Sequence, residues 1–127
     1  MDATNALFFI AILIMSVVIH EISHGFVAEY FGDDTARNAG RLTLNPLKHL
    51  DLFGSILLPT LMFFTTGFVF GWAKPVPYNP YNLSNRKWGT IAVSAAGILA
   101  NIFIAVIFGL LIRLTLESGL PPEFYVI

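Results

Sequence analysis

Cysteine is absent from this chain of 127 residues, and charged side chains are scarce. Without cysteine the chain can form neither a disulfide framework nor a thiolate metal site. Cysteine usage therefore does not indicate whether the protein works in an oxidising or a reducing compartment. Asp, Glu, Lys and Arg make up 12 % of the residues, against about 25 % in soluble domains. The formal net charge of −1 provides no basic surface for a nucleic acid, so no nucleic-acid partner is expected.

Apolar residues take the place of the missing charge. They form 56 % of the chain, and the mean hydropathy is +0.73. A small soluble domain buries only part of its surface, so it could not remove this much apolar area from water. A water-soluble enzyme, a nucleic-acid-binding protein and a disordered chain are therefore poor interpretations, and the composition predicts a protein of the lipid bilayer.

Three long apolar stretches cover residues 6–31, 52–72 and 90–112. Each has about the 20 residues that a helix needs to cross a bilayer. Any one of them could instead be a buried core helix, but three in so short a chain favour membrane spans. We therefore predict an all-α polytopic membrane protein with about three transmembrane helices, folded as one membrane-embedded unit over residues 1–127.

Two polar segments, residues 32–51 and 73–89, separate these stretches. Each holds three Lys or Arg residues, so the excess of positive charge that marks cytoplasmic loops gives no orientation. Residues 41–44 alternate polar and apolar, which predicts a short strand, and prolines in the second segment force an extended backbone. We expect short extended or β segments here, either as ordinary interfacial loops or as an unpaired edge that accepts a peptide as an added strand.

The sequence His20-Glu21-Ile22-Ser23-His24 lies in the first apolar stretch. On a helix, His20 and His24 are one turn apart and project from one face, so both imidazoles can bind one zinc ion. Glu21 follows the first ligand and can reach the attacking water, as a general base that later protonates the leaving amine. Catalytic zinc sites use three protein ligands, so a third must come from elsewhere.

The depth of this motif in the membrane strengthens its functional interpretation. At 1.5 Å per residue, His20 lies about 21 Å into a hydrocarbon core of about 30 Å. Ionisable groups at such a depth cost about 2.5–3.5 kcal/mol each, so they mark a function or an internal partner. Three alternatives stay open: a pair of interfacial histidines, an inactive module that binds metal or a partner helix, and a heme- or metal-handling subunit that uses the histidine pair.

Three motifs in order, HEISHG at residues 20–25, GRLTLNP at 40–46 and GWAKPVPYNP at 71–80, carry a family resemblance. The chain resembles the site-2 protease family of intramembrane zinc metalloproteases, in its compact prokaryotic branch without a PDZ domain. The resemblance implies a multi-pass protein of the prokaryotic cell membrane that hydrolyses peptide bonds in or near transmembrane helices. It makes His20 and His24 ligands of one Zn²⁺ per chain and Glu21 the catalytic acid and base.

The resemblance also implies partners and a missing ligand. Membrane-anchored regulatory proteins would be the substrates, and the active site would lie nearer the cytoplasmic face, with residues 32–51 on that side. The family takes its third zinc ligand from an Asp in a later Leu-Asp-Gly pattern, which this chain does not contain. We therefore expect either a truncated sequence or an inactive relative. The oligomeric state is left open.

A further family pattern, Ala-Gly-Pro-x-x-Asn, reads Ala-Gly-Ile-Leu-Ala-Asn at residues 96–101. Ile98 replaces the proline, while Gly97 and Asn101 keep their places. Asn101 lies mid-span, where an unpaired amide is costly. It is therefore either a hydrogen-bonding contact between helices beside a small residue or, with Gly97, part of a substrate-binding or cavity-lining surface.

Three other ionisable residues are weaker candidates as metal ligands. His49 and Asp51 precede the second apolar stretch, and we expect both to be solvated loop residues. Glu29 lies about 140° around the helix from His24, which excludes a shared metal.

Overall fold

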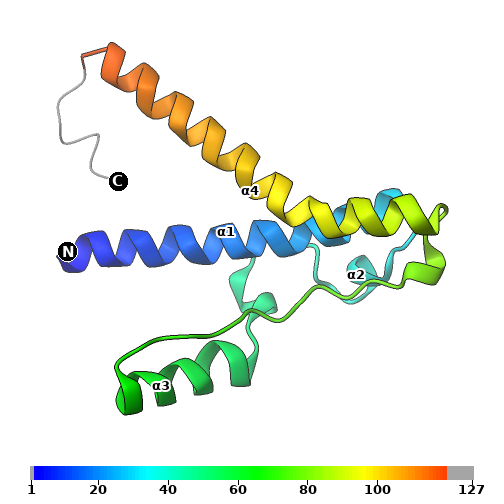
Figure 1. The fold of residues 1–127 in the computed structure, drawn as a ribbon, viewed down its shortest axis with the longest axis horizontal. Helices are drawn as coiled ribbons and strands as arrows, with labels where there is room; N and C mark the ends of the chain where they lie inside the picture. Colours follow the sequence, from blue (N-terminus) through cyan, green and yellow to red (C-terminus); the bar gives the residue numbers. More distant parts are fainter. Residues whose placement is uncertain (1, 120–127) are drawn as a thin grey trace.

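The computed structural model describes residues 2–119 and consists of helices and connecting segments. Two long helices, α1 (Ala3–Tyr30) and α4 (Arg86–Glu117), run antiparallel and make the most extensive contact in the molecule. They lie side by side at the C-terminal end of α1 and diverge toward its N-terminal end (Figure 1). The connection between them contains the short helices α2 (Thr35–Asn38), η1 (Pro46–His49) and η3 (Pro80–Asn82), and an arm, described below, made of a helical run and an extended return.

Both long helices are capped at their N-termini by side chains. The carboxylate of Asp2 accepts a hydrogen bond from the Asn5 amide, and the side chain of Asn85 accepts one from the Trp88 amide. These caps satisfy backbone donors that have no partner within the helix. α1 ends at Tyr30, and two residues later Gly32 turns the chain away with a φ of 102°, a conformation that other residues avoid.

α1 and α4 are long and apolar enough to cross a membrane. With 28 and 32 residues they extend about 42 and 48 Å, more than a hydrocarbon core of about 30 Å. Only 11 % of the most apolar window of each helix is buried inside the structure, unlike the core helix of a soluble protein. The expected all-helical fold is confirmed for the described residues, and these two helices have the length and composition of membrane spans.

The middle apolar stretch, residues 52–72, does not form the third spanning helix that we expected. It forms a π-helix, η2 (Leu52–Leu57), that continues into α3 (Leu58–Thr66), together about 22 Å long. Gly67 adopts a left-handed φ of 74° and ends α3, and the chain then returns along it in an extended course (Figure 1). The apolar composition predicted burial in lipid but could not show that a glycine turn divides the stretch.

The expected strand at residues 41–44 is also wrong, since residues 2–119 contain no strand. A strand needs a neighbour to pair with, and this segment bonds instead to nearby loops and side chains. The Arg41 amide donates to the Ala36 carbonyl, and the Thr43 carbonyl lies 2.9 Å from Nε2 of the His49 ring. Residues 41–44 do alternate between polar and apolar, but no second strand among the described residues lies beside them to form a sheet.

A buried carboxylate fastens the connection where α1 ends. Asp33 is fully buried and accepts hydrogen bonds from the amide and hydroxyl of Thr35, the amide of Asn79 and the side-chain amide of Asn82. Burial disfavours its charged form, but these four hydrogen bonds outweigh burial and lower the pKa of Asp33. Asp33 thereby joins the start of the connection to its end just before α4.

Candidate metal centre

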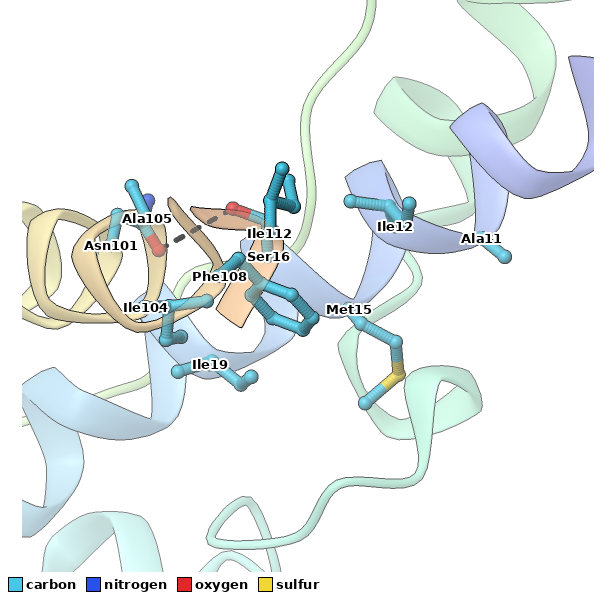
Figure 2. Close-up of a pocket in the computed structure, with 10 residues that line it drawn as sticks. All are labelled: Ala11, Ile12, Met15, Ser16, Ile19, Asn101, Ile104, Ala105, Phe108 and Ile112. Atoms are coloured by element: carbon cyan, nitrogen blue, oxygen red, sulfur yellow. Dashed lines mark hydrogen bonds between the residues drawn. The ribbon is translucent and has the colours of Figure 1, made fainter. Parts of the chain in front are cut away.

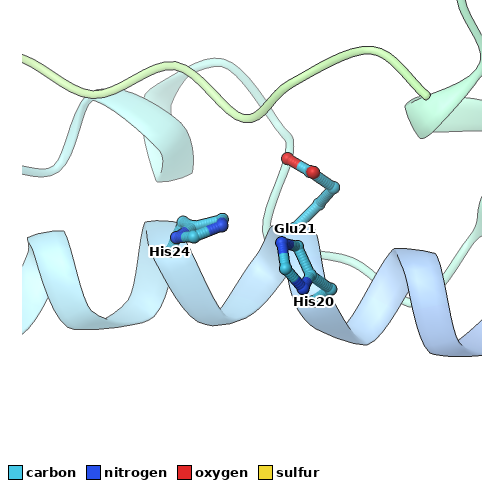
Figure 3. A group of neighbouring side chains, drawn as sticks. All are labelled: His20, Glu21 and His24. Atoms are coloured by element: carbon cyan, nitrogen blue, oxygen red, sulfur yellow. The ribbon is translucent and has the colours of Figure 1, made fainter. Parts of the chain in front are cut away.

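His20, Glu21 and His24 occupy one turn of α1 (Figure 3). One potential ligand atom from each residue lies within 4.8 Å of the others, and all three side chains are half-buried. The two imidazole rings lie edge to face with their centroids 4.8 Å apart, while Glu21 projects toward the extended segment (Figure 3). The structure therefore brings together the three side chains that the sequence predicted to lie close to one another.

One nitrogen of the His24 ring contacts helix α4. Its Nδ1 lies 2.5 Å from the carbonyl oxygen of Val93. A carbonyl oxygen can only accept, so Nδ1 carries the proton and donates it. The neutral ring then keeps the lone pair of Nε2, which is the form in which histidine binds a metal.

The ring of His20 packs directly on α4. A Cβ atom built on Gly97 would lie 2.5 to 2.7 Å from three atoms of this ring, namely Cε1, Nε2 and Cδ2. Because the three distances are nearly equal, Gly97 lies over the face of the ring and does not cover Nε2 in the plane of the ring. Nδ1 of the same ring lies 3.3 Å from the side-chain nitrogen of Asn101.

The carboxylate of Glu21 points away from α4 toward the chain that returns from α3. Its Oε2 accepts a hydrogen bond of 3.1 Å from the Val76 amide. The same extended segment is held on one edge by two further backbone bonds, from the Trp72 amide to Gly54 and from the Lys74 amide to His49. α1 therefore presents both imidazoles to α4 and the carboxylate to the extended segment.

This donor set fits a zinc ion. Two imidazole nitrogens with a carboxylate beside them suit Zn²⁺, which takes nitrogen and oxygen ligands. Among residues 2–119, no other group of His, Cys, Asp or Glu is gathered this closely. Glu29 is not part of this group and instead pairs with Arg37. The part of the chain that the structure describes thus supplies the histidine pair and its carboxylate, and no third ligand.

The two other loop candidates are placed differently from each other. His49, expected to be solvated, is 2 % exposed, and its Nδ1 has no hydrogen-bond partner. That expectation was wrong because η1, which ends at His49, packs against α1. Asp51 is half-buried, caps η2 by accepting from the Phe53 amide, and accepts a hydrogen bond of 2.7 Å from the indole of Trp72.

Asn101 and Ser16 line a groove between α1 and α4 (Figure 2). The groove has a volume of about 570 Å³ and is otherwise apolar. The Ser16 hydroxyl lies 3.4 Å from the side-chain oxygen of Asn101, so this pair forms the polar part of the lining. Asn101 thus lines this groove and joins α4 to α1 by a hydrogen bond, and the role of Asn101 or Gly97 toward a substrate or a metal cavity stays a prediction.

Sequence reasoning did not find Val93 and Val76 as contributors to the site. Both act through backbone atoms, the first through its carbonyl and the second through its amide. No side-chain pattern can show such contacts, because every residue carries a backbone carbonyl and nearly every residue an amide. The only available signal was the position of Val76 between two prolines, which predicted an extended backbone there.

Comparison with known proteins identifies the class. The model of peptidase family M50 matches residues 8–122, so this chain belongs to that family. The resemblance to the site-2 protease family that the three motifs carried is confirmed. The family is membrane-embedded, in agreement with the two long apolar helices.

Two relatives make the similarity more specific. The chain is 46 % identical over 95 residues to a Bacillus subtilis protein named "Putative zinc metalloprotease YwhC", covering 75 % of this chain and 40 % of the relative. It is 36 % identical over 94 residues to "Putative zinc metalloprotease Rip2" of Mycolicibacterium smegmatis, covering 74 % of this chain and 35 % of that relative. The chain thus spans well under half the length of these relatives. No solved structure matches it significantly.

Proposed function

We propose that this chain forms the histidine-bearing part of an intramembrane zinc endopeptidase that holds one Zn²⁺ and cleaves peptide bonds in or near transmembrane helices. The observation that carries the proposal is the meeting of His20, Glu21 and His24 on one turn of an apolar helix within 4.8 Å. Membership of peptidase family M50 and the names of the relatives support metal-dependent peptide hydrolysis. Membrane-anchored regulatory proteins are the substrate class that the family resemblance favours.

In this proposal the two histidines hold the metal through Nε2, because Nδ1 of each ring faces α4. The bound zinc would polarise the attacking water and the substrate carbonyl. Glu21 takes the proton from the attacking water and passes it to the leaving amine. The Val76 amide holds the carboxylate of Glu21 in place, since a hydrogen bond to a charged group is a strong one.

The extended segment around residues 71–79 would hold the substrate. In an extended chain, successive residues point their amide and carbonyl groups to opposite edges, and residues 72, 74 and 76 turn theirs toward the protein. The groups of Gly71 and Ala73 then face the other edge, where a peptide could pair as an added strand. This arrangement would present an unwound substrate backbone next to Glu21.

The fold also supports a membrane orientation that the sequence left undecided. With three spans expected, residues 32–51 and 73–89 would lie on opposite sides of the bilayer. Their equal numbers of Lys and Arg residues then gave no orientation. Because the middle stretch is too short to cross, both belong to the single connection from α1 to α4. Six of the 7 Lys and Arg residues lie in this connection or at the start of α4, and Arg113 is the other. The positive-inside rule then favours a cytoplasmic location for the connection and for the site near it.

Paired substitutions test the chemistry in purified protein. Glu21→Gln should retain zinc and lose cleavage of a transmembrane peptide substrate, because the amide cannot take a proton from water. His24→Ala should lose zinc and cleavage together. Retained cleavage by Glu21→Gln would remove the proposed base. A visible heme absorption band in the wild-type protein would instead favour the heme-handling alternative.

Single cysteines test the orientation, because the chain contains none of its own. Arg37→Cys and Arg113→Cys lie on exposed side chains in the connection and near the end of α4, respectively. In intact cells a membrane-impermeant maleimide should label only the second. Labelling of Arg37→Cys alone would reverse the orientation.

A further inference from the structure

We infer that Asn101 is a positioning residue for His20 and that its amide turns its oxygen toward the ring when the site holds metal. This inference rests on the proposed zinc site. It differs from the substrate-binding role expected from the family pattern, because it assigns Asn101 to a ligand ring rather than to the substrate. The evidence is the contact between the Asn101 amide and His20 Nδ1 at 3.3 Å.

The two histidines contact α4 in parallel ways. His24 meets the Val93 carbonyl and His20 meets Asn101, both through Nδ1 and both on α4. Val93 and Asn101 are eight residues apart on α4, about 80° around its axis, so both fall within the side of α4 that packs against α1. Metal-bound histidines generally donate their second ring N–H to an oxygen atom, which fixes the ring and its tautomer. α4 is positioned to supply that oxygen to both rings.

The orientation of the Asn101 amide decides which nitrogen of His20 is free. In the structure its Nδ2 faces Nδ1 of His20 and its Oδ1 faces the Ser16 hydroxyl. An amide nitrogen can only donate, so this arrangement leaves the proton of a neutral His20 ring on Nε2, where it blocks metal binding. Rotating the amide by 180° would place Oδ1 against Nδ1–H and free Nε2.

Ser16 allows both orientations because a hydroxyl group donates or accepts. In the rotated state it accepts a hydrogen bond from the Asn101 amide nitrogen, so no buried polar atom loses its partner. Every polar group of Ser16, Asn101 and His20 in this contact therefore has a hydrogen-bond partner in both orientations. Metal binding to Nε2 of His20 favours the rotated one. Gly97 keeps the face of the His20 ring close enough to α4 for this contact.

Zinc affinity of purified full-length protein, measured by competition with a chromophoric chelator, tests the inference without an activity readout. Asn101→Leu should weaken zinc binding by about 10- to 100-fold, the usual cost of losing such an outer partner. Asn101→Asp should bind zinc at least as tightly as wild type, because a carboxylate oxygen accepts from Nδ1–H. Ser16→Ala should cause a smaller loss, and Phe108→Leu, a change in the groove wall, should cause none.

A direct view of the rotation comes from ring-nitrogen chemical shifts of ¹⁵N-histidine-labelled protein. The proton of His20 should move from Nε2 to Nδ1 when zinc is added, whereas His24 should carry it on Nδ1 before and after. Equal zinc affinity of Asn101→Leu and wild type would overturn the positioning role. A His20 proton on Nδ1 before zinc is added would contradict the rotation. Wild-type protein that binds no zinc would refute the proposed function itself.

Discussion

The two ends of the α1–α4 pair are built differently. At the end that holds the histidines, small residues bring the helices together: Gly97 lies against His20, and Ala28 packs with Val93 in the buried core. At the other end the helices diverge, a groove opens between them, and a Cβ placed on Gly109 would meet nothing within 4 Å (Figures 1 and 2). The same pair of helices is therefore tightly packed in one half and open in the other.

This difference shows where close packing is needed. In a bilayer, lipid chains are as apolar as leucine, so helices associate through van der Waals contact and hydrogen bonds at small residues. Those contacts are concentrated where imidazole rings must be held to within fractions of an ångström. The divergent half, faced with large apolar side chains such as Phe8, Leu13 and Phe108, is suited to contact with lipid or another helix.

Placing a methyl group at the tight end should produce the largest effect. Gly97→Ala would push its Cβ into the face of the His20 ring, and overpacking of this kind costs about 1–3 kcal/mol. We expect lower thermal stability and loss of zinc binding, measured by tryptophan fluorescence on heating and by metal analysis. Gly109→Ala, on the same helix in open space, is the matched control and should keep both properties. Equal effects of the two substitutions would remove the contrast between the ends.

A second disruptive substitution lies where the extended segment crosses η2. A Cβ on Gly71 would overlap the Gly54 carbonyl and lie 2.7 Å from the ring of Pro59. Gly71→Ala should shift the segment that holds Glu21, reducing cleavage while zinc affinity changes little, because the histidines are held by α4. A loss of zinc binding as large as that in Gly97→Ala would contradict this separation of roles.

Acid should weaken the tight end through Asp33. Its pKa is lowered in the folded protein, so the unfolded chain binds its proton first, and the stabilisation is complete above the ordinary value of 3.8. As the pH falls below 3.8 toward the folded pKa, the melting temperature should decrease. Asn replacement leaves a buried donor facing another donor, at a cost of about 1–3 kcal/mol. Asp33→Asn should therefore melt lower at neutral pH and lose part of the acid dependence; an unchanged acid profile would exclude Asp33 as its source.

The open end should tolerate the loss of its ion pair. Arg113 and Glu117 form an exposed pair one turn apart on α4, with 76 % and 60 % of their side chains accessible. Exposed pairs of this kind contribute little, about 0.3–0.5 kcal/mol at most. Arg113→Ala should shift the melting temperature by less than any substitution above. A shift comparable to that of Gly97→Ala would show that the far end is more constrained than its geometry suggests.

Much of the site could be predicted from the sequence because it is local. His20, Glu21 and His24 are four residues apart at most, and helix geometry alone brings them to one turn. The role of Asn101 could not be predicted, because its contact with His20 joins residues 81 positions apart. The same holds for Val76 and Glu21, which meet only because the chain turns back at Gly67.

Composition and spacing by themselves determined that long apolar helices form and that His20, Glu21 and His24 share one turn of the first, because apolar runs and helical periodicity are properties of neighbouring residues. Only the tertiary structure decided that the middle apolar stretch turns back, that both polar segments form one connection, and that α4 supplies the partners of both imidazoles. Those outcomes depend on which distant surfaces fit together, and small residues such as Gly97 determine that fit through the space they leave free.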